Sequence, residues 1–159
     1  HGADDHDPVA DMAAQVAASV GAAGDTPLLV KLGPSTDEVS VKTMVAAALD
    51  AGARGIVATN TIPPDRSELL ANQDFVWPRY ENKPVGGYSG PGLLDIACQM
   101  VDWAREVGGT NMPLMGVGGV QDGASAKRLL DAGADAIQLY TALTYQGPAV
   151  LRKIKAAIA

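Results

Sequence analysis

The chain has 159 residues, of which 47% are hydrophobic and 19% charged, a composition that excludes a disordered acidic tail and fits about one average domain. The formal net charge of −6 and the pI of about 4.7 argue against nucleic-acid binding through a broad basic surface. The single cysteine, Cys98, excludes an intramolecular disulfide, and the sequence contains no run of about 18 apolar residues that would predict a transmembrane helix.

Short apolar runs alternate with amphipathic stretches, beginning with a predicted helix over Val9–Val20. Four runs bounded by glycine, proline or polar residues are predicted to be strands: Leu28–Leu32, Gly55–Thr59, Leu114–Val117 and Ala136–Tyr140. Their near-continuous hydrophobicity is typical of parallel strands that are covered on both faces. Further helices are predicted from Ser35 to about Ala51, over Leu93–Val107, from Asp122 to near Gly133, and over Ala149–Ile158.

An internal repeat supports this alternation, because Ala51–Ile56 (AGARGI) recurs as Ala132–Ile137 (AGADAI). Each copy indicates a helix, a glycine just past its end, and a strand. Ser35 and Glu38 have the S-x-x-E spacing of a capping box, which predicts a helix start. Four strand–helix units after a leading helix require right-handed crossovers, so the predicted fold class is α/β.

The segment 62–85 interrupts this rhythm with four prolines and with Trp77 and Tyr80. A loop of that length inside a compact domain is usually a lid or a binding loop. A disordered surface insertion fits the length equally well, so both interpretations stay open.

Polar residues gather where the first two predicted strands end, which is where α/β folds place ligands. Lys31 stands in an otherwise apolar strand. It is either a lysine whose ammonium reaches water at the strand end or a fixed positive charge beside a bound anion. The second strand ends in Thr59, Asn60 and Thr61, whose small polar side chains can hold a ligand or form an ordinary turn.

Glycine loops precede two of the predicted helices, at Gly86–Gly90 and Gly116–Gly119. Such loops allow backbone N–H groups to approach a phosphate at the start of a helix. The backbone of Tyr140–Ala142, after the last strand, can complete the cradle. Because the loops after the last two strands form the recurrent phosphate site of (β/α)8 barrels, we predict a phosphate-binding site here.

Five motifs occur in the order and spacing of the dihydroorotate dehydrogenases: LVK (29–31), ATNT (58–61), GGYSG (86–90), GVGGV (116–120) and QLYTAL (138–143). From about Pro27 onward the chain resembles the C-terminal half of that FMN-binding (β/α)8 TIM barrel. The resemblance implies that residues 1–159 form a half-barrel of four parallel βα units plus a leading helix, with 62–85 as a long loop within it. Related FMN barrels share the ATNT motif and the glycine loops, whereas QLYTAL running on to Gly147 and Pro148 favours the quinone-linked type.

The resemblance also implies a role for each motif residue. Lys31 would contact the flavin ring near N1 and O2, and Asn60 and Thr61 would hydrogen-bond the pyrimidine, which is dihydroorotate or orotate. The other FMN contacts that it implies are Thr59, Ser89, Gly90, Gly118, Gly119, Tyr140 and Thr141, the last four at the phosphate.

The implied reaction is the oxidation of dihydroorotate to orotate in pyrimidine (UMP) biosynthesis, with FMN as the cofactor. The family's catalytic base, a Ser or a Cys, belongs to a strand expected before His1, so no catalytic residue is predicted in this chain and the chain alone is expected to be inactive. Cys98 falls on the apolar stripe of a helix and is predicted to be a core residue. His1 and His6 lie among aspartates, and no metal site is predicted from them.

Two other hypotheses stay open: a half-barrel that binds a phosphate ligand without redox activity, and a segment of another FMN barrel oxidoreductase. A half-barrel exposes unpaired strand edges, so we expect it to associate with the missing N-terminal half or with itself. No nucleic-acid partner is expected, and membrane contact is expected only through a segment outside this chain. The expected location is cytoplasmic, or peripheral to a membrane for a quinone-linked parent, and the electron acceptor (quinone, fumarate or NAD) stays open.

Overall fold

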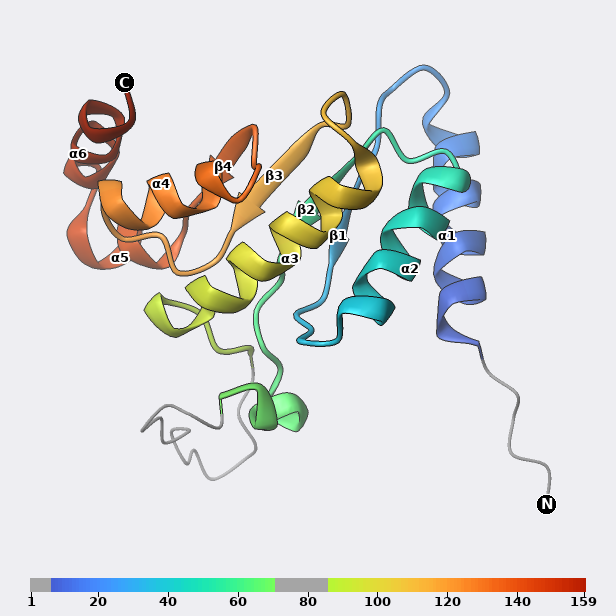
Figure 1. Cartoon of the computed structure of the whole chain (residues 1–159), viewed down its shortest axis with the longest axis horizontal. Coiled ribbons are helices and arrows are strands. Elements are labelled where there is room, and N and C mark those ends of the chain that lie inside the picture. Colours follow the sequence, from blue (N-terminus) through green and yellow to red (C-terminus); the bar gives the residue numbers. More distant parts are fainter. Residues whose placement is uncertain (1–6, 71–85) are drawn as a thin grey trace.

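The structure is a computed structural model, and it describes residues 7–70 and 86–159 (Figure 1). In chain order its elements are α1 (Pro8–Ala23), β1 (Leu29–Leu32), α2 (Glu38–Asp50), β2 (Gly55–Ala58), the 3-10 segments η1 (Pro64–Leu70) and η2 (Pro91–Leu93), α3 (Leu94–Gly108), β3 (Leu114–Val117), α4 (Gly123–Asp131), β4 (Ala136–Gln138), α5 (Thr141–Gln146) and α6 (Ala149–Ile158). The predicted α/β fold, with four parallel βα units behind a leading helix, is confirmed.

The four strands form one parallel sheet in the order β1-β2-β3-β4. Lys31 pairs with Val57, Val57 with Met115, and Met115 with Ala136, so one row of residues crosses the whole sheet. The C-terminal ends of all four strands consequently meet at one edge. Figure 1 shows α2, α3 and α4 in front of the sheet, and α3 packs on β2 and β3.

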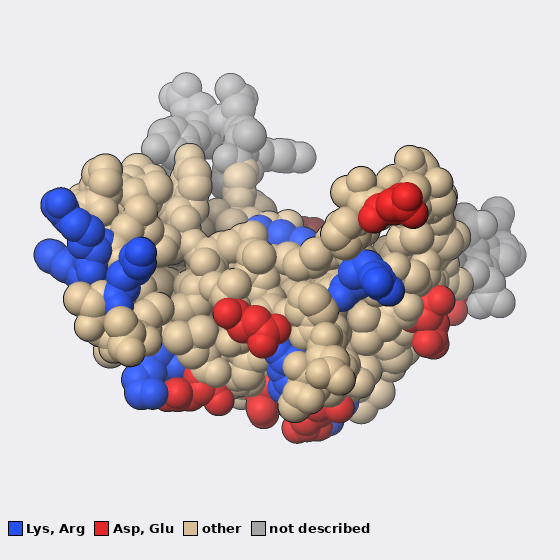
Figure 2. Space-filling view, turned by 90° about the horizontal axis from the view of Figure 1, so that it is seen from above, with Lys and Arg blue, Asp and Glu red and all other residues tan. Residues whose placement is uncertain are grey.

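The two faces of the sheet differ in burial. Leu32, Ile56 and Leu114 are at most 2% exposed and belong to the main hydrophobic core under the helices. Because successive strand residues point to opposite faces, Lys31 and Met115 lie on the other face, and both are more exposed. Figure 2 shows that the side away from α2, α3 and α4 is hollowed.

Helix starts agree with the sequence at α4 and differ from it at α2. The Asp122 carboxylate accepts the Ser125 N–H at 2.8 Å, which caps α4 as predicted. The capping box predicted for Ser35 and Glu38 is wrong, because Asp37 is the N-cap of α2 and accepts the Val39 N–H at 3.2 Å. The Ser35 hydroxyl instead accepts the Asp37 N–H at 3.1 Å, so it shapes the turn before the helix.

The last strand is shorter than predicted, since β4 ends at Gln138 and Tyr140 is the N-cap of a short helix, α5, that the sequence did not predict. The predicted loop 62–85 is described only up to residue 70, where it contains η1. The rest, with Trp77 and Tyr80, lies outside the described residues, so its role as a lid or an insertion stays a prediction.

At the N-terminal ends of β3 and β4, the Arg105 guanidinium joins three elements. It donates to the Gly133 carbonyl at 2.9 and 2.7 Å, to the Met112 carbonyl at 2.8 Å, and to the Asp135 carboxylate at 2.9 Å. The same carboxylate accepts the Leu114 N–H at 2.8 Å. That hydrogen bond first, and Arg105 second, lower the pKa of Asp135 below its usual value.

Cys98 is half-buried and packs against the core, as its place on the apolar stripe of α3 predicted. Burial raises the pKa of its thiol. Among residues 7–70 and 86–159, no helix is both long and apolar enough to cross a bilayer.

Candidate functional site

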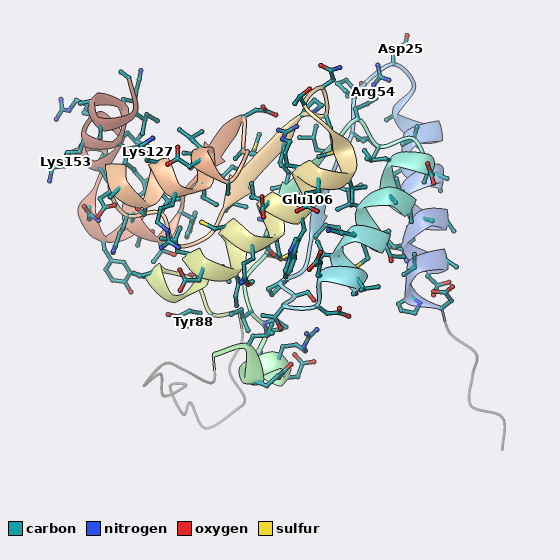
Figure 3. The ribbon with its side chains drawn as sticks, viewed as in Figure 1. Asp25, Arg54, Tyr88, Glu106, Lys127 and Lys153 are labelled. Atoms are coloured by element: carbon teal, nitrogen blue, oxygen red, sulfur yellow. The ribbon has the colours of Figure 1, made fainter. Side chains whose placement is uncertain are left out.

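A cleft of about 730 Å³ opens at the C-terminal edge of the sheet, where the four strands end. All eight residues predicted to contact FMN line it: Lys31, Thr59, Ser89, Gly90, Gly118, Gly119, Tyr140 and Thr141. Figure 3 shows Tyr88, which precedes Ser89, at this edge, and Arg54 and Asp25 at the opposite one. The fold therefore brings residues more than a hundred positions apart in the chain to one cavity.

Lys31 gives the cleft its positive charge. Its side chain is exposed on β1, and within the described part of the chain no carboxylate lies within ion-pair distance of its ammonium. The described residues that line the cleft include no aspartate or glutamate. The cation is therefore available to an anionic ligand.

The strand end after β2 is held by hydrogen bonds to its neighbours. Thr59 is 1% exposed, and its hydroxyl donates to the Leu32 carbonyl at 3.1 Å while its N–H donates to the Val117 carbonyl at 2.8 Å. Its peptide bond to Ala58 is cis. The Asn60 N–H also donates to the Leu32 carbonyl, at 2.8 Å. These bonds fix the point from which the next two polar side chains emerge.

Asn60 and Thr61 are placed differently. Thr61 is half-buried and lines the cleft, whereas Asn60 is exposed and is not among the lining residues. The Asn60 side-chain oxygen accepts the Thr61 N–H at 2.9 Å. The amide nitrogen of Asn60 thus remains to donate to a ligand.

The loop Gly86–Gly90 connects the two ends of the cleft. Tyr88 and Ile62 exchange backbone hydrogen bonds of 2.7 and 3.1 Å, which form an antiparallel bridge. One residue further on, the Ser89 and Thr141 hydroxyls lie 2.9 Å apart and share a hydrogen bond. The loop is therefore tied both to the strand end after β2 and to the start of α5.

The loop after β3 packs on the beginning of α3. Gly118 and Gly119 have φ values of +137° and +73°, which favour glycine. A Cβ on Gly119 would lie 2.7 Å from the Leu94 backbone nitrogen, so only glycine permits this close approach. The two glycines leave a stretch of backbone at the cleft in place of side chains, as a phosphate cradle requires.

Sequence reasoning missed the apolar residues that line the cleft: Leu93, Val117, Val120, Ile137, Leu139 and Leu151. Most of them lie inside or beside the GVGGV and QLYTAL motifs. Their place in these motifs is the sequence signal from which they could have been predicted. Leu151 comes from α6, and only the tertiary structure places it here. An apolar wall with a few convergent polar groups is typical of cofactor sites.

The cleft fits FMN in its chemistry. It has a cation at the β1 end, apolar walls between, and glycine backbone with two hydroxyls at the β3 and β4 end. A flat ring system that carries negative charge when reduced suits the first part, and a phosphate suits the second.

The family model for dihydroorotate dehydrogenase matches residues 1–159. Curated relatives called dihydroorotate dehydrogenase (quinone) include that of Halobacterium salinarum, 38% identical over 144 residues, and that of Chloroflexus aurantiacus, 37% identical over 135 residues. These matches cover 91% and 85% of this chain, but the chain spans only 38% and 36% of those relatives. Among solved structures, ligand-free DHODH from Eimeria tenella matches with a TM-score of 0.65 at 28% identity, over 82% of this chain and 34% of that one.

Proposed function

The chain belongs to the dihydroorotate dehydrogenase family, and on this premise we propose that it is part of an FMN-dependent enzyme that oxidises dihydroorotate to orotate. One observation carries the proposal: all eight residues that the motifs imply as FMN contacts line the same cleft. The described residues that line this cleft include no aspartate or glutamate. Since the chain spans 38% of the Halobacterium relative, the activity is proposed for the whole protein.

In this proposal the residues of the chain hold FMN at both ends. The Lys31 ammonium would face the flavin ring and stabilise negative charge there, and Thr59, at the end of β2, would also contact FMN. The backbone around Gly118, Gly119, Tyr140 and Thr141 would hold the phosphate, and Ser89 and Gly90 would line the FMN site beside it. FMN, when bound, supplies the redox chemistry, and the protein supplies placement and electrostatics.

Asn60 and Thr61 are proposed to orient the pyrimidine against the ring. Because the Asn60 oxygen is engaged by the Thr61 N–H, Asn60 offers its NH2 group, which suits a carbonyl oxygen of the substrate. The Thr61 hydroxyl offers both a donor and an acceptor from inside the cleft. No residue of this chain is proposed as the base that removes the substrate proton.

Binding of FMN to the purified chain tests the cofactor site. We expect FMN fluorescence to be quenched on binding, riboflavin to bind more weakly because it lacks the phosphate, and inorganic phosphate to compete with FMN. A sample that stays colourless after incubation with FMN would contradict flavin binding by this chain. Competition by phosphate without any flavin binding would favour a phosphate-binding half-barrel instead.

We further propose a quinone as the electron acceptor, on the basis of the relatives' names and the QLYTAL motif. The FMN-loaded chain, once reduced with dithionite, is expected to be reoxidised by a soluble quinone faster than by fumarate or NAD. Faster reoxidation by fumarate or NAD would contradict this assignment.

A further inference from the structure

Close packing against Thr61, and not backbone conformation, requires a glycine at position 87. Its neighbour Gly86 has a φ of +129°, but Gly87 lies outside the left-handed region that favours glycine. A Cβ on Gly87 would instead collide with the Thr61 hydroxyl oxygen, and it would lie 2.6 Å from Thr61 Cβ and 3.0 Å from the Ile62 carbonyl oxygen. Any side chain at this position must therefore displace Thr61.

The two segments cannot simply separate to relieve that collision. The Tyr88 N–H donates to the Ile62 carbonyl at 2.7 Å, and the Ile62 N–H donates to the Tyr88 carbonyl at 3.1 Å. Each of these residues is the direct chain neighbour of one of the two that would collide. On the other side, Ile62 is fully buried in the core. The residue that must give way is thus Thr61, whose side chain lines the cleft.

We propose that Gly87 is a positioning residue for the pyrimidine site. The missing side chain lets the loop Gly86–Gly90 press directly on Thr61, which holds the Thr61 hydroxyl at the place where it meets the substrate. The inference rests on the proposed function, in which Thr61 hydrogen-bonds the pyrimidine. It adds a residue that touches neither substrate nor FMN and acts only through Thr61.

Gly87→Ala tests the inference, with Gly33→Ala as the matched control. Gly33 follows β1 at the C-terminal edge and, like Gly87, lies outside the left-handed region, but a Cβ there meets nothing within 4 Å. In the FMN-loaded protein, titrated with orotate and followed by flavin absorbance, we expect G87A to weaken orotate binding about five- to tenfold, as the loss of one well-placed hydrogen bond does. FMN affinity should stay within about twofold, and G33A should change neither affinity.

A second variant keeps the test decisive if G87A does not fold. Thr61→Gly removes both atoms that the Gly87 Cβ would strike hardest, so it should weaken orotate binding by itself. In the T61G background, G87A should cost less than about a further twofold, because its target is gone.

Three results would overturn the proposal: unchanged orotate affinity in folded G87A, unchanged orotate affinity in T61G, or equal losses of FMN and orotate affinity in G87A. Failure of the unsubstituted, FMN-loaded protein to bind orotate would overturn the proposed function as well, which separates the two failures.

Discussion

Lys31 is a charged side chain in an apolar strand, and its role separates a cofactor contact from a lysine that only reaches water. Lys31→Met keeps much of the side-chain volume but removes the charge. If Lys31 faces an anionic part of FMN, the substitution should weaken FMN binding about tenfold or more, since hydrogen bonds to charged groups contribute about 1.5–3 kcal/mol. Fluorescence titration measures the change.

Lys42→Met is the control for Lys31→Met, because Lys42 is paired with Glu38 and Glu106 on the outer helices. We expect it to leave FMN affinity unchanged. Equal FMN affinities for K31M and the unsubstituted chain would contradict a contact between Lys31 and FMN. Lys31 would then be a lysine whose ammonium only reaches water at the strand end.

Asp135 makes stability depend on pH. Its pKa is lowered in the folded chain by the Leu114 N–H and by Arg105, so its stabilising contribution is present above the unfolded pKa of about 3.9 and is lost as the pH falls through the lower folded value. Asp135→Asn should therefore be less stable than the unsubstituted chain near neutral pH, and the difference should shrink below about pH 4. Urea denaturation at several pH values measures the free energy of unfolding of both chains, with D131N as the control for an exposed carboxylate. A difference in that free energy that stays constant down to pH 2 would contradict the prediction.

Helix α3 is joined to the edge of the sheet opposite the cleft by Arg105, whose guanidinium donates hydrogen bonds to residues before β3 and β4. Arg105→Lys keeps the charge but cannot reproduce the planar, multiple hydrogen bonds of a guanidinium. We expect it to lower the free energy of unfolding by about 1–3 kcal/mol. Arg128→Lys, whose one described partner is Asp95 on the surface, should stay within about 0.5 kcal/mol. Equal stabilities for the two variants would contradict the joining role of Arg105.

Several elements were predicted well from signals within a few residues, but the start of α2 and the short helix α5 were not. The apolar run Leu114–Val117 and the Asp122 cap carry their signals within a few residues, and both agree with the structure. The short helix α5 contradicted the expectation of a strand reaching Tyr140, because six residues carry too little periodicity to be recognised.

The site divides in the same way. Motif residues such as Lys31 and Thr141 line one cleft, since strand ends of a parallel sheet converge, and their contacts with FMN stay a prediction. The exclusion of Asn60 from the cleft lining and the contact of Gly87 with Thr61 depend on side-chain direction and on close packing. Neither property has a signature in the residue pattern alone.

In the described part of the molecule α2, α3 and α4 cover one face of the sheet, and β1 and β4 are its two edge strands (Figure 1). Leu29 on β1 is 39% exposed, and β1 pairs only with β2 among the described strands. We therefore predict that the purified chain self-associates with rising concentration, through strand edges that need a partner. Leu29→Lys should shift the equilibrium toward monomer in analytical ultracentrifugation, because edge lysines oppose strand pairing.

Val39→Lys makes the same chemical change on the outside of α2, at a residue that is 72% exposed, and should leave the self-association unchanged. A monomer at every concentration, or equal effects of L29K and V39K, would contradict association through the sheet edge.

The Ile62–Tyr88 bridge has a consequence for how chain length can vary in this fold. Two backbone hydrogen bonds hold residues 62 and 88 together, so the chain between them starts and ends at one point. Because the free energy of closing a loop varies only slowly with its length, the bridge should tolerate changes in the number of residues between 71 and 85 without moving residues 62 and 88.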